Sequence, residues 1–386
     1  MAEVRTMFKH RGLLIIFLCL IVASILGFLM LANNTPKAQN LFTYKDIVIT
    51  QEQNVKTVMA AGGNVVVDSN IKGNIFVVDG DLTINAGSKV GGQIVVLGGD
   101  ITVSPLAELR YKPFVFLLHG HPVVPLVVAL LLGLGALCLI LLPLLLWLAG
   151  YYFKRSPFYQ PAKAFLLEAQ ERWSSLYIVL GFVLSAGMLY IFLNLAWKTF
   201  FKASTVLFDD AFIWLVRYYA NPALDKFMLF ITDIGFGKGY AIIVAATFAL
   251  LAYKKRWPDL SALAICLAGA GLLSVFLKNS FQRMRPDSFF LVQETSFSFP
   301  SGHAMATMCF YGMLAFFLMR EAKSWSLRLL IATLAVILSL IIGLSRIYLG
   351  VHYPTDVVAG YAVGFMWLLF CISLLLKQQK KKQSKV

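Results

Sequence analysis

The chain has 386 residues, of which 59% are hydrophobic and only 14% are charged. This composition excludes a soluble domain of this size, and its runs of about 20 apolar residues predict transmembrane helices. The formal net charge of +15 could indicate a nucleic-acid partner, but the basic residues gather in the short segments between the apolar runs. We therefore exclude nucleic-acid binding and assign the positive charge to membrane topology.

The apolar runs predict a mainly α, polytopic membrane protein with eight spans. These cover residues 13–32, 122–150, 175–197, 228–252, 259–277, 303–319, 327–344 and 357–376. Counted through these spans, the basic clusters all fall on one side, and the positive-inside rule makes that side cytoplasmic. We therefore expect an integral plasma-membrane protein with a basic cytoplasmic tail at 377–386. Residues 1–32 are either an uncleaved anchor, which we favour, or a cleaved signal peptide.

Residues 33–121 form a separate, extracytoplasmic segment in which Val and Ile alternate with Gly, Asn and Asp. The stretch from Gly73 to Ile84 recurs 19 residues later, from Gly92 to Val103, and a shorter copy begins at Gly63. Such repeats predict stacked short strands, either a small β-solenoid or a repeated hairpin. The spacing weakly resembles the bactofilin-type β-helix. We expect this module to serve as a binding or spacing element, to self-associate with other copies of the chain, or to contact a partner in the cell envelope.

Two further segments connect these parts. Residues 122–174 comprise the second span and a cytoplasmic linker, and residues 200–226 join the third and fourth spans on the outer side. The outer segment carries Asp209, Asp210 and Arg217 among aromatic residues, which is typical of a helix at the membrane interface. It is either an ordinary exterior loop or a segment that guides substrate.

Three polar clusters interrupt the apolar second half of the chain, and the topology places all three on the outer face. They are Lys278 to Pro286, Pro300 to His303, and Ser345-Arg346 followed by His352 and Asp356. Charged groups at the ends of membrane spans are costly unless they line a site, which makes them functional candidates.

The residue types in these clusters suit the binding and cleavage of a phosphate ester. Ser301 is a favoured helix N-cap and Gly302 permits close approach of an anion to free backbone N–H groups. The cations Lys278, Arg285 and Arg346 can neutralise phosphate oxygens. Asp356 can accept a hydrogen bond from His352, so that His352 and His303 serve as one nucleophile and one proton carrier. We interpret Arg283 as a membrane-edge anchor, and no metal-ligand cluster is present in the sequence.

These clusters resemble the three signature motifs of the type 2 phosphatidic acid phosphatase (PAP2) superfamily over residues 175–376. The matching patterns are Lys278-x6-Arg285-Pro286, Pro300-Ser301-Gly302-His303 and Ser345-Arg346-x5-His352-x3-Asp356. The resemblance implies a six-helix core and a phosphatase without metal or cofactor. It also implies that His303 forms a phosphohistidine and that His352, paired with Asp356, protonates the leaving oxygen and then activates water. Lys278, Arg285, Ser301, the Gly302 backbone and Arg346 would hold the phosphoryl oxygens.

The expected substrate is a lipid phosphate or diphosphate at the outer membrane face. We favour undecaprenyl diphosphate, with phosphatidic acid or phosphatidylglycerol phosphate as the alternative. A phosphotransferase and a non-enzymatic membrane scaffold are two further readings. Membrane lipids are the expected surroundings of the PAP2-like core.

Overall fold

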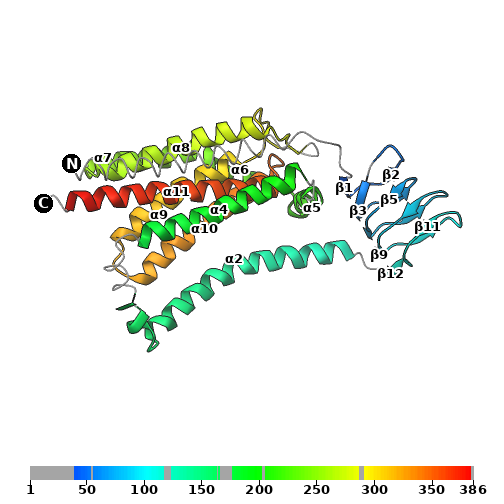
Figure 1. The fold of residues 1–386 in the computed structure, drawn as a ribbon, viewed down its shortest axis with the longest axis horizontal. Coiled ribbons are helices and arrows are strands. Elements are labelled where there is room, and N and C mark those ends of the chain that lie inside the picture. Colours follow the sequence, from blue (N-terminus) through cyan, green and yellow to red (C-terminus); the bar gives the residue numbers. More distant parts are fainter. Residues whose placement is uncertain are drawn as a thin grey trace.

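The computed structural model describes residues 39–53, 55–116, 123–162, 164–165, 176–201, 205–286 and 291–383. A bundle of long helices carries a small β module at one end (Figure 1). The helices are α2 (Val123–Arg155), α4 (Leu176–Phe200), α5 (Val206–Arg217), α6 (Pro222–Phe236), α7 (Lys238–Tyr253), α8 (Trp257–Phe281), α9 (Gly302–Glu321), α10 (Trp325–Tyr348) and α11 (Pro354–Gln383).

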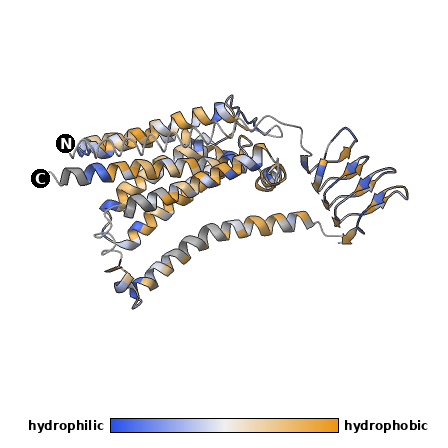
Figure 2. Ribbon diagram, in the orientation of Figure 1, coloured by the Kyte–Doolittle hydropathy of each residue, from blue (hydrophilic) through white to orange (hydrophobic). Residues whose placement is uncertain are grey.

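Six candidate membrane spans lie within the described residues, formed by α4, by α6 together with α7, and by α8, α9, α10 and α11. Apolar residues dominate these helices along their length (Figure 2). The expected polytopic helical fold with a β module is therefore confirmed. The predicted span at 122–150 falls on the largely aliphatic helix α2, whereas the one at 13–32 lies outside the described residues.

The fourth predicted span differs from a continuous helix, because the chain breaks at Gly237 between α6 and α7. The carboxylate of Asp233 accepts hydrogen bonds from the backbone N–H groups of Lys238 and Gly239, at 2.9 and 2.8 Å. These bonds satisfy the free donors at the start of α7. A side chain at Gly237 would collide with Asp233, since an added Cβ would lie 2.0 Å from its Oδ1. An Asp four residues before a glycine thus converts one span into two helices.

Helix α9 lies in the middle of the core and packs against α8, α10 and α11. Glycines allow its close approach to α11: a Cβ at Gly364 would lie 3.0 Å from the backbone oxygen of Met305, and one at Gly312 would lie 2.3 Å from Leu368. Small residues at helix contacts are a common means of tight packing in membranes, where dispersion replaces the hydrophobic effect. The ends of α9 and α11 are therefore held in a fixed relative position.

The β module is a solenoid of parallel strands. Its strands are β1 (Gln39–Thr43), β2 (Ile47–Ile49), β3 (Val55–Ala61), β4 (Val65–Val67), β5 (Asn70–Ile71), β6 (Ile75–Val78), β7 (Leu82–Ile84), β8 (Lys89–Val90), β9 (Ile94–Leu97), β10 (Ile101–Val103), β11 (Glu108–Leu109) and β12 (Phe114–Phe116). They form three sheets in the orders β1-β3-β6-β9-β12, β10-β7-β4-β2 and β11-β8-β5.

The 19-residue repeat of the sequence is the rung length of this solenoid, since Ile75 pairs with Ile94. Every pairing between its described strands is parallel, so the hairpin alternative is wrong. The Asx residues at the turns form a ladder in which the side-chain oxygen of Asn64 accepts from Asp81 N, and that of Asp81 accepts from Asp100 N, at 2.8 and 2.9 Å. Local turn chemistry therefore repeats with the rungs.

Candidate active site

The three polar clusters meet at the end of the bundle that carries the β module. Lys278 lies in the last turn of α8 and Arg346 in the last turn of α10, while Ser301 caps α9 and Asp356 lies in the first turn of α11. The backbone N–H of Ser301 donates to the carbonyl of Asp356 at 3.0 Å, which joins the starts of α9 and α11 directly. The structure thus brings the predicted site residues of four helices together.

The start of α9 has the local structure from which the sequence predicts an anion cradle. Ser301 is its N-cap and accepts a hydrogen bond from the backbone N–H of Ala304 at 3.5 Å. A Cβ added to Gly302 would lie 2.9 Å from the hydroxyl of Ser274 and 4.0 Å from the side chain of Lys278. The remaining free N–H groups and the helix dipole favour an anion at this position.

Two predicted cations are anchored by the loop before α9 and by the loop before α11. Lys278 Nζ donates to the hydroxyl of Ser296 at 2.9 Å. Arg285 donates to the carbonyl oxygens of Ser296 and Val351 at 2.7 and 2.6 Å. These bonds fix the direction of the guanidinium group of Arg285 while the two cations share Ser296 as a common partner.

The third cation, Arg346, is only 2% exposed. It donates to Thr232 of α6 at 2.8 Å and to Glu294 at 2.6 Å, and Glu294 also lies 3.8 Å from Arg285. Sequence reasoning missed Glu294, because a single acidic residue in a polar loop carries no distinctive pattern. Its carboxylate occupies the two guanidinium groups that were expected to bind phosphate oxygens.

The two histidines occupy different environments. His352 is buried, and its Nδ1 lies 3.5 Å from Oδ2 of Asp356. Burial lowers the pKa of His352 well below its ordinary value, and the nearby charges of Arg346, Arg285 and Lys278 lower it further. His303 is half-buried, and its ring centre lies 5.2 Å from that of Phe236. It is close enough to His352 and to the three cations to interact with their charges.

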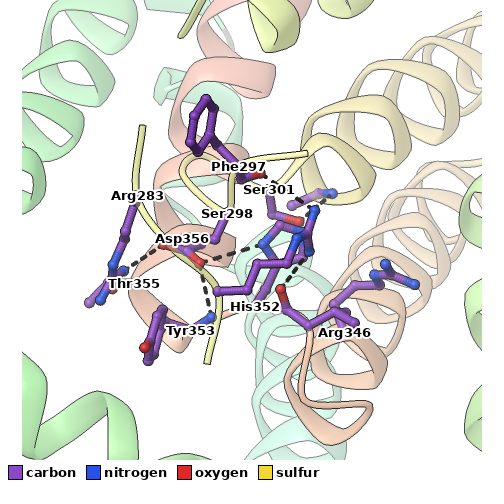
Figure 3. Close-up of polar contacts among 12 residues, drawn as sticks. Arg283, Phe297, Ser298, Ser301, Arg346, His352, Tyr353, Thr355 and Asp356 are labelled. Carbon is purple, nitrogen blue, oxygen red and sulfur yellow. Dashed lines mark hydrogen bonds and ion pairs between the residues drawn. The ribbon is translucent and has the colours of Figure 1, made fainter. Parts of the chain in front are cut away.

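Arg283 is not the surface anchor that its position at a membrane edge suggested. Its guanidinium group donates to Asp356 Oδ1 at 2.5 Å, to Thr355 Oγ1 at 2.8 Å and to Asp209 Oδ2 at 2.8 Å, and it stacks 3.9 Å from the ring centre of Tyr353. Figure 3 shows Asp356 between Arg283 and His352. Burial lowers the pKa of Arg283, but the two carboxylates outweigh burial and raise it above its ordinary value.

Comparison with known proteins identifies the family of this chain. The PAP2 superfamily model matches residues 259–380. Phosphatidylglycerophosphatase B of Bacillus subtilis is 34% identical over 160 residues, which are 41% of this chain and 78% of that protein. The chain belongs to the PAP2 superfamily. An undecaprenyl-diphosphatase of Sulfolobus acidocaldarius is 26% identical over 189 residues, covering 47% of this chain and 85% of that protein.

The solved structures include a crystal structure of a transmembrane PAP2-type phosphatidylglycerolphosphate phosphatase from Bacillus subtilis. It aligns with a TM-score of 0.46 at 29% identity, over 50% of this chain and 96% of that one. Family membership makes this chain an integral membrane enzyme, a PAP2 lipid phosphatase. The PAP2 model begins in α8 and ends in α11, so it covers all three polar clusters and leaves the β module outside.

Proposed function

We propose that this PAP2 enzyme hydrolyses a lipid phosphate or diphosphate without a metal ion, through a phosphohistidine. His303, His352 and Asp356 are the catalytic residues, and Lys278, Arg285, Ser301, Gly302 and Arg346 bind the phosphoryl group. The observation that carries the proposal is the convergence of three cations and the start of α9 on two histidines, one of which faces a buried carboxylate. Such preorganised donors stabilise the charge that develops in the transition state.

The geometry favours His352 as the nucleophile, the reverse of the roles implied by the sequence resemblance. The carboxylate of Asp356 lies 3.5 Å from Nδ1 of His352, which favours the proton on that nitrogen and leaves the lone pair on Nε2. His303 stands beside Phe236, a residue that is 59% exposed. In-line displacement places nucleophile and leaving group on opposite sides of phosphorus, so the leaving oxygen departs towards the lipid-facing side, where His303 protonates it.

A trapping experiment distinguishes the two role assignments. With p-nitrophenyl phosphate, whose leaving group needs no proton, H303A should still form a phosphoprotein when quenched in the first turnover. H352A should form none, and mass spectrometry of wild-type protein should locate the phosphoryl group on His352. Phosphate on His303, or a phosphoprotein in H352A, would restore the opposite assignment. Reactions are run with EDTA, and loss of turnover in EDTA would overturn the metal-independent mechanism.

As substrate we propose undecaprenyl diphosphate first and phosphatidylglycerol phosphate second. The first is supported by Lys238, an exposed cation two residues beyond Phe236, because a diphosphate carries a further charged group that this lysine can bind. The second is supported by the similarity to the Bacillus phosphatidylglycerophosphatase. We would measure phosphate release from both lipids and from phosphatidic acid by protein purified in detergent. Lys238→Ala should lower turnover of the diphosphate more than that of the monoesters, and equal losses would remove the preference.

We also propose that the active site and the β module face the outside of the cell. The opposite end of the bundle carries Lys254, Lys255, Arg256 and Arg320, which the positive-inside rule assigns to the cytoplasm. In a cysteine-free background, Lys112→Cys in the β module should react with a membrane-impermeant maleimide in intact spheroplasts, and Lys255→Cys should not. The reverse labelling pattern would invert the topology.

A further inference from the structure

We propose that Asp209 and Arg283 form a positioning pair for the catalytic carboxylate, and that the β module holds this pair in place by packing on α5. The inference rests on the proposed function, because it assigns these residues an effect on the reaction of His352. Neither residue belongs to the three signature motifs, and Asp209 lies 74 residues before Arg283 in the chain. The pair therefore adds an element outside the PAP2 motifs to the catalytic machinery.

The bonds of Asp356 explain why Arg283 controls it. One carboxylate oxygen, Oδ1, accepts from Arg283 at 2.5 Å, while the other, Oδ2, accepts from the backbone N–H of Tyr353 at 2.9 Å and faces His352. Each oxygen therefore has a separate task. Loss of the bond from Arg283 would leave Oδ1 without its ion pair, so the carboxylate would be held less firmly and its second oxygen would orient the imidazole ring less well.

Asp209 fixes Arg283 from the other side. It is completely buried, and its Oδ2 accepts from Arg283 at 2.8 Å and from the hydroxyl of Thr355 at 2.8 Å, while its Oδ1 accepts from the Thr355 backbone N–H at 3.1 Å. Asp209 thus ties α5 both to the segment after α8 and to the first turn of α11. A buried ion pair adds little net stability compared with apolar packing, so a role in orientation accounts better for its presence beside the catalytic dyad.

Helix α5 connects this pair to the β module because its two faces pack on different partners. Ile213 and Val216 pack against Ala304, Ile347 and Val357 beside the active site.

The opposite face of α5 packs against the β module. Trp214, Leu215 and Tyr218 pack with Ala61 and Val78 of the solenoid, and the ring of Trp214 lies 5.7 Å from that of Phe42. A partly open apolar pocket of about 250 Å³ lies between α5, α2 and the solenoid. This incomplete packing gives α5 room to shift when the contact with the module is weakened.

The first test separates positioning from stability. Asp209→Asn keeps the size of the side chain but removes its charge, and kcat should fall about 100-fold, as expected when a catalytic group is displaced by about 1 Å, while KM stays unchanged. The rate of phosphohistidine formation should fall by the same factor. Arg283→Lys, which keeps the charge but loses the fork of donors, should lose less activity than Arg283→Met.

The matched control is Asp259→Asn at the other end of the bundle. Asp259 is buried as Asp209 is, and it also pairs with arginine, although with two of them, Arg256 and Arg320. The Asp259→Asn substitution should lower the melting temperature about as much as Asp209→Asn does, but it should leave kcat unchanged. Equal kcat losses in both variants, or wild-type kcat in Asp209→Asn, would overturn the inference. An inactive wild-type protein would instead overturn the proposed function.

The second test asks whether the β module acts through Asp209. Trp214→Ala weakens the contact between α5 and the solenoid, and kcat should fall on the order of 10-fold. In the Asp209→Asn background the same substitution should have little further effect, because contacting groups in one network are not additive. A Trp214→Ala effect that persists unchanged in that background, or no effect in the wild type, would show that the module does not act through this pair.

Discussion

Glu294→Gln should strengthen the binding of phosphate to the active site. The carboxylate of Glu294 lies 2.6 Å from one guanidinium nitrogen of Arg346 and 3.8 Å from one of Arg285. A bound phosphate must compete with it for these donors and is also repelled by its negative charge. Glutamine keeps the shape of the side chain and removes both effects, so the substitution isolates the charge.

The magnitude follows from these distances. Two unit charges at about 4 Å interact with about 4 kcal/mol at an effective dielectric of about 20, but the Glu294 side chain is 28% exposed, and water screens it. Hydrogen bonds to charged groups contribute about 1.5–3 kcal/mol net. Because about 1.4 kcal/mol corresponds to a factor of ten in affinity, we expect an affinity gain of about 10- to 100-fold.

Inhibition of phosphate release by orthovanadate and by inorganic phosphate measures this affinity in detergent-purified enzyme. Both inhibition constants should fall in Glu294→Gln. Glu321→Gln is the control, because Glu321 pairs with Arg256 at the far end of the bundle and should leave both constants unchanged. Constants that stay the same or rise in Glu294→Gln would show that Glu294 orients the guanidinium groups instead of competing with phosphate.

Three further outcomes concern stability and pH. Burial, followed by the charge of a neighbouring carboxylate, raises the pKa of Asp210 to about 6. Asp210→Asn should therefore raise the melting temperature when this is measured above pH 6. The gain should shrink as the pH falls from 6 to 3.8 and vanish below 3.8, where the wild-type side chain is protonated in both states; an equal gain at pH 4 and pH 7.5 would contradict this assignment. The lowered pKa of His352 makes the unfolded state bind more protons than the folded state below about pH 6.5, so the protein loses stability as the pH falls through this range. His352→Gln should reduce that loss in thermal melts, because glutamine does not titrate. Gly343→Ala should destabilise the protein by about 1–3 kcal/mol, because its Cβ would lie 1.9 Å from the hydroxyl of Tyr361, whereas Gly271→Ala, with open space around it, should not; equal melting temperatures for the two variants would refute the packing argument.

Local sequence determined much of this protein. Apolar runs of bilayer length gave the positions of the six spans among the described residues, because each helix satisfies its own backbone in lipid. Ser301 before Gly302 and Pro354 before Asp356 marked the starts of α9 and α11, since capping depends on adjacent residues. The 19-residue repeat showed a β module, because each rung reuses the same turn chemistry.

The tertiary structure decided what depends on distant residues. Whether the repeats pair in parallel or as hairpins is a matter of long-range register, and the sequence pattern suits both. Arg283 and Asp209 each resemble an ordinary interfacial charge until folding buries them against one another. Glu294 became part of the site only when the loop after α8 placed it between two arginines. Charge pairing in a low-dielectric interior is set by three-dimensional proximity, and proximity across 74 residues leaves no local trace in the chain.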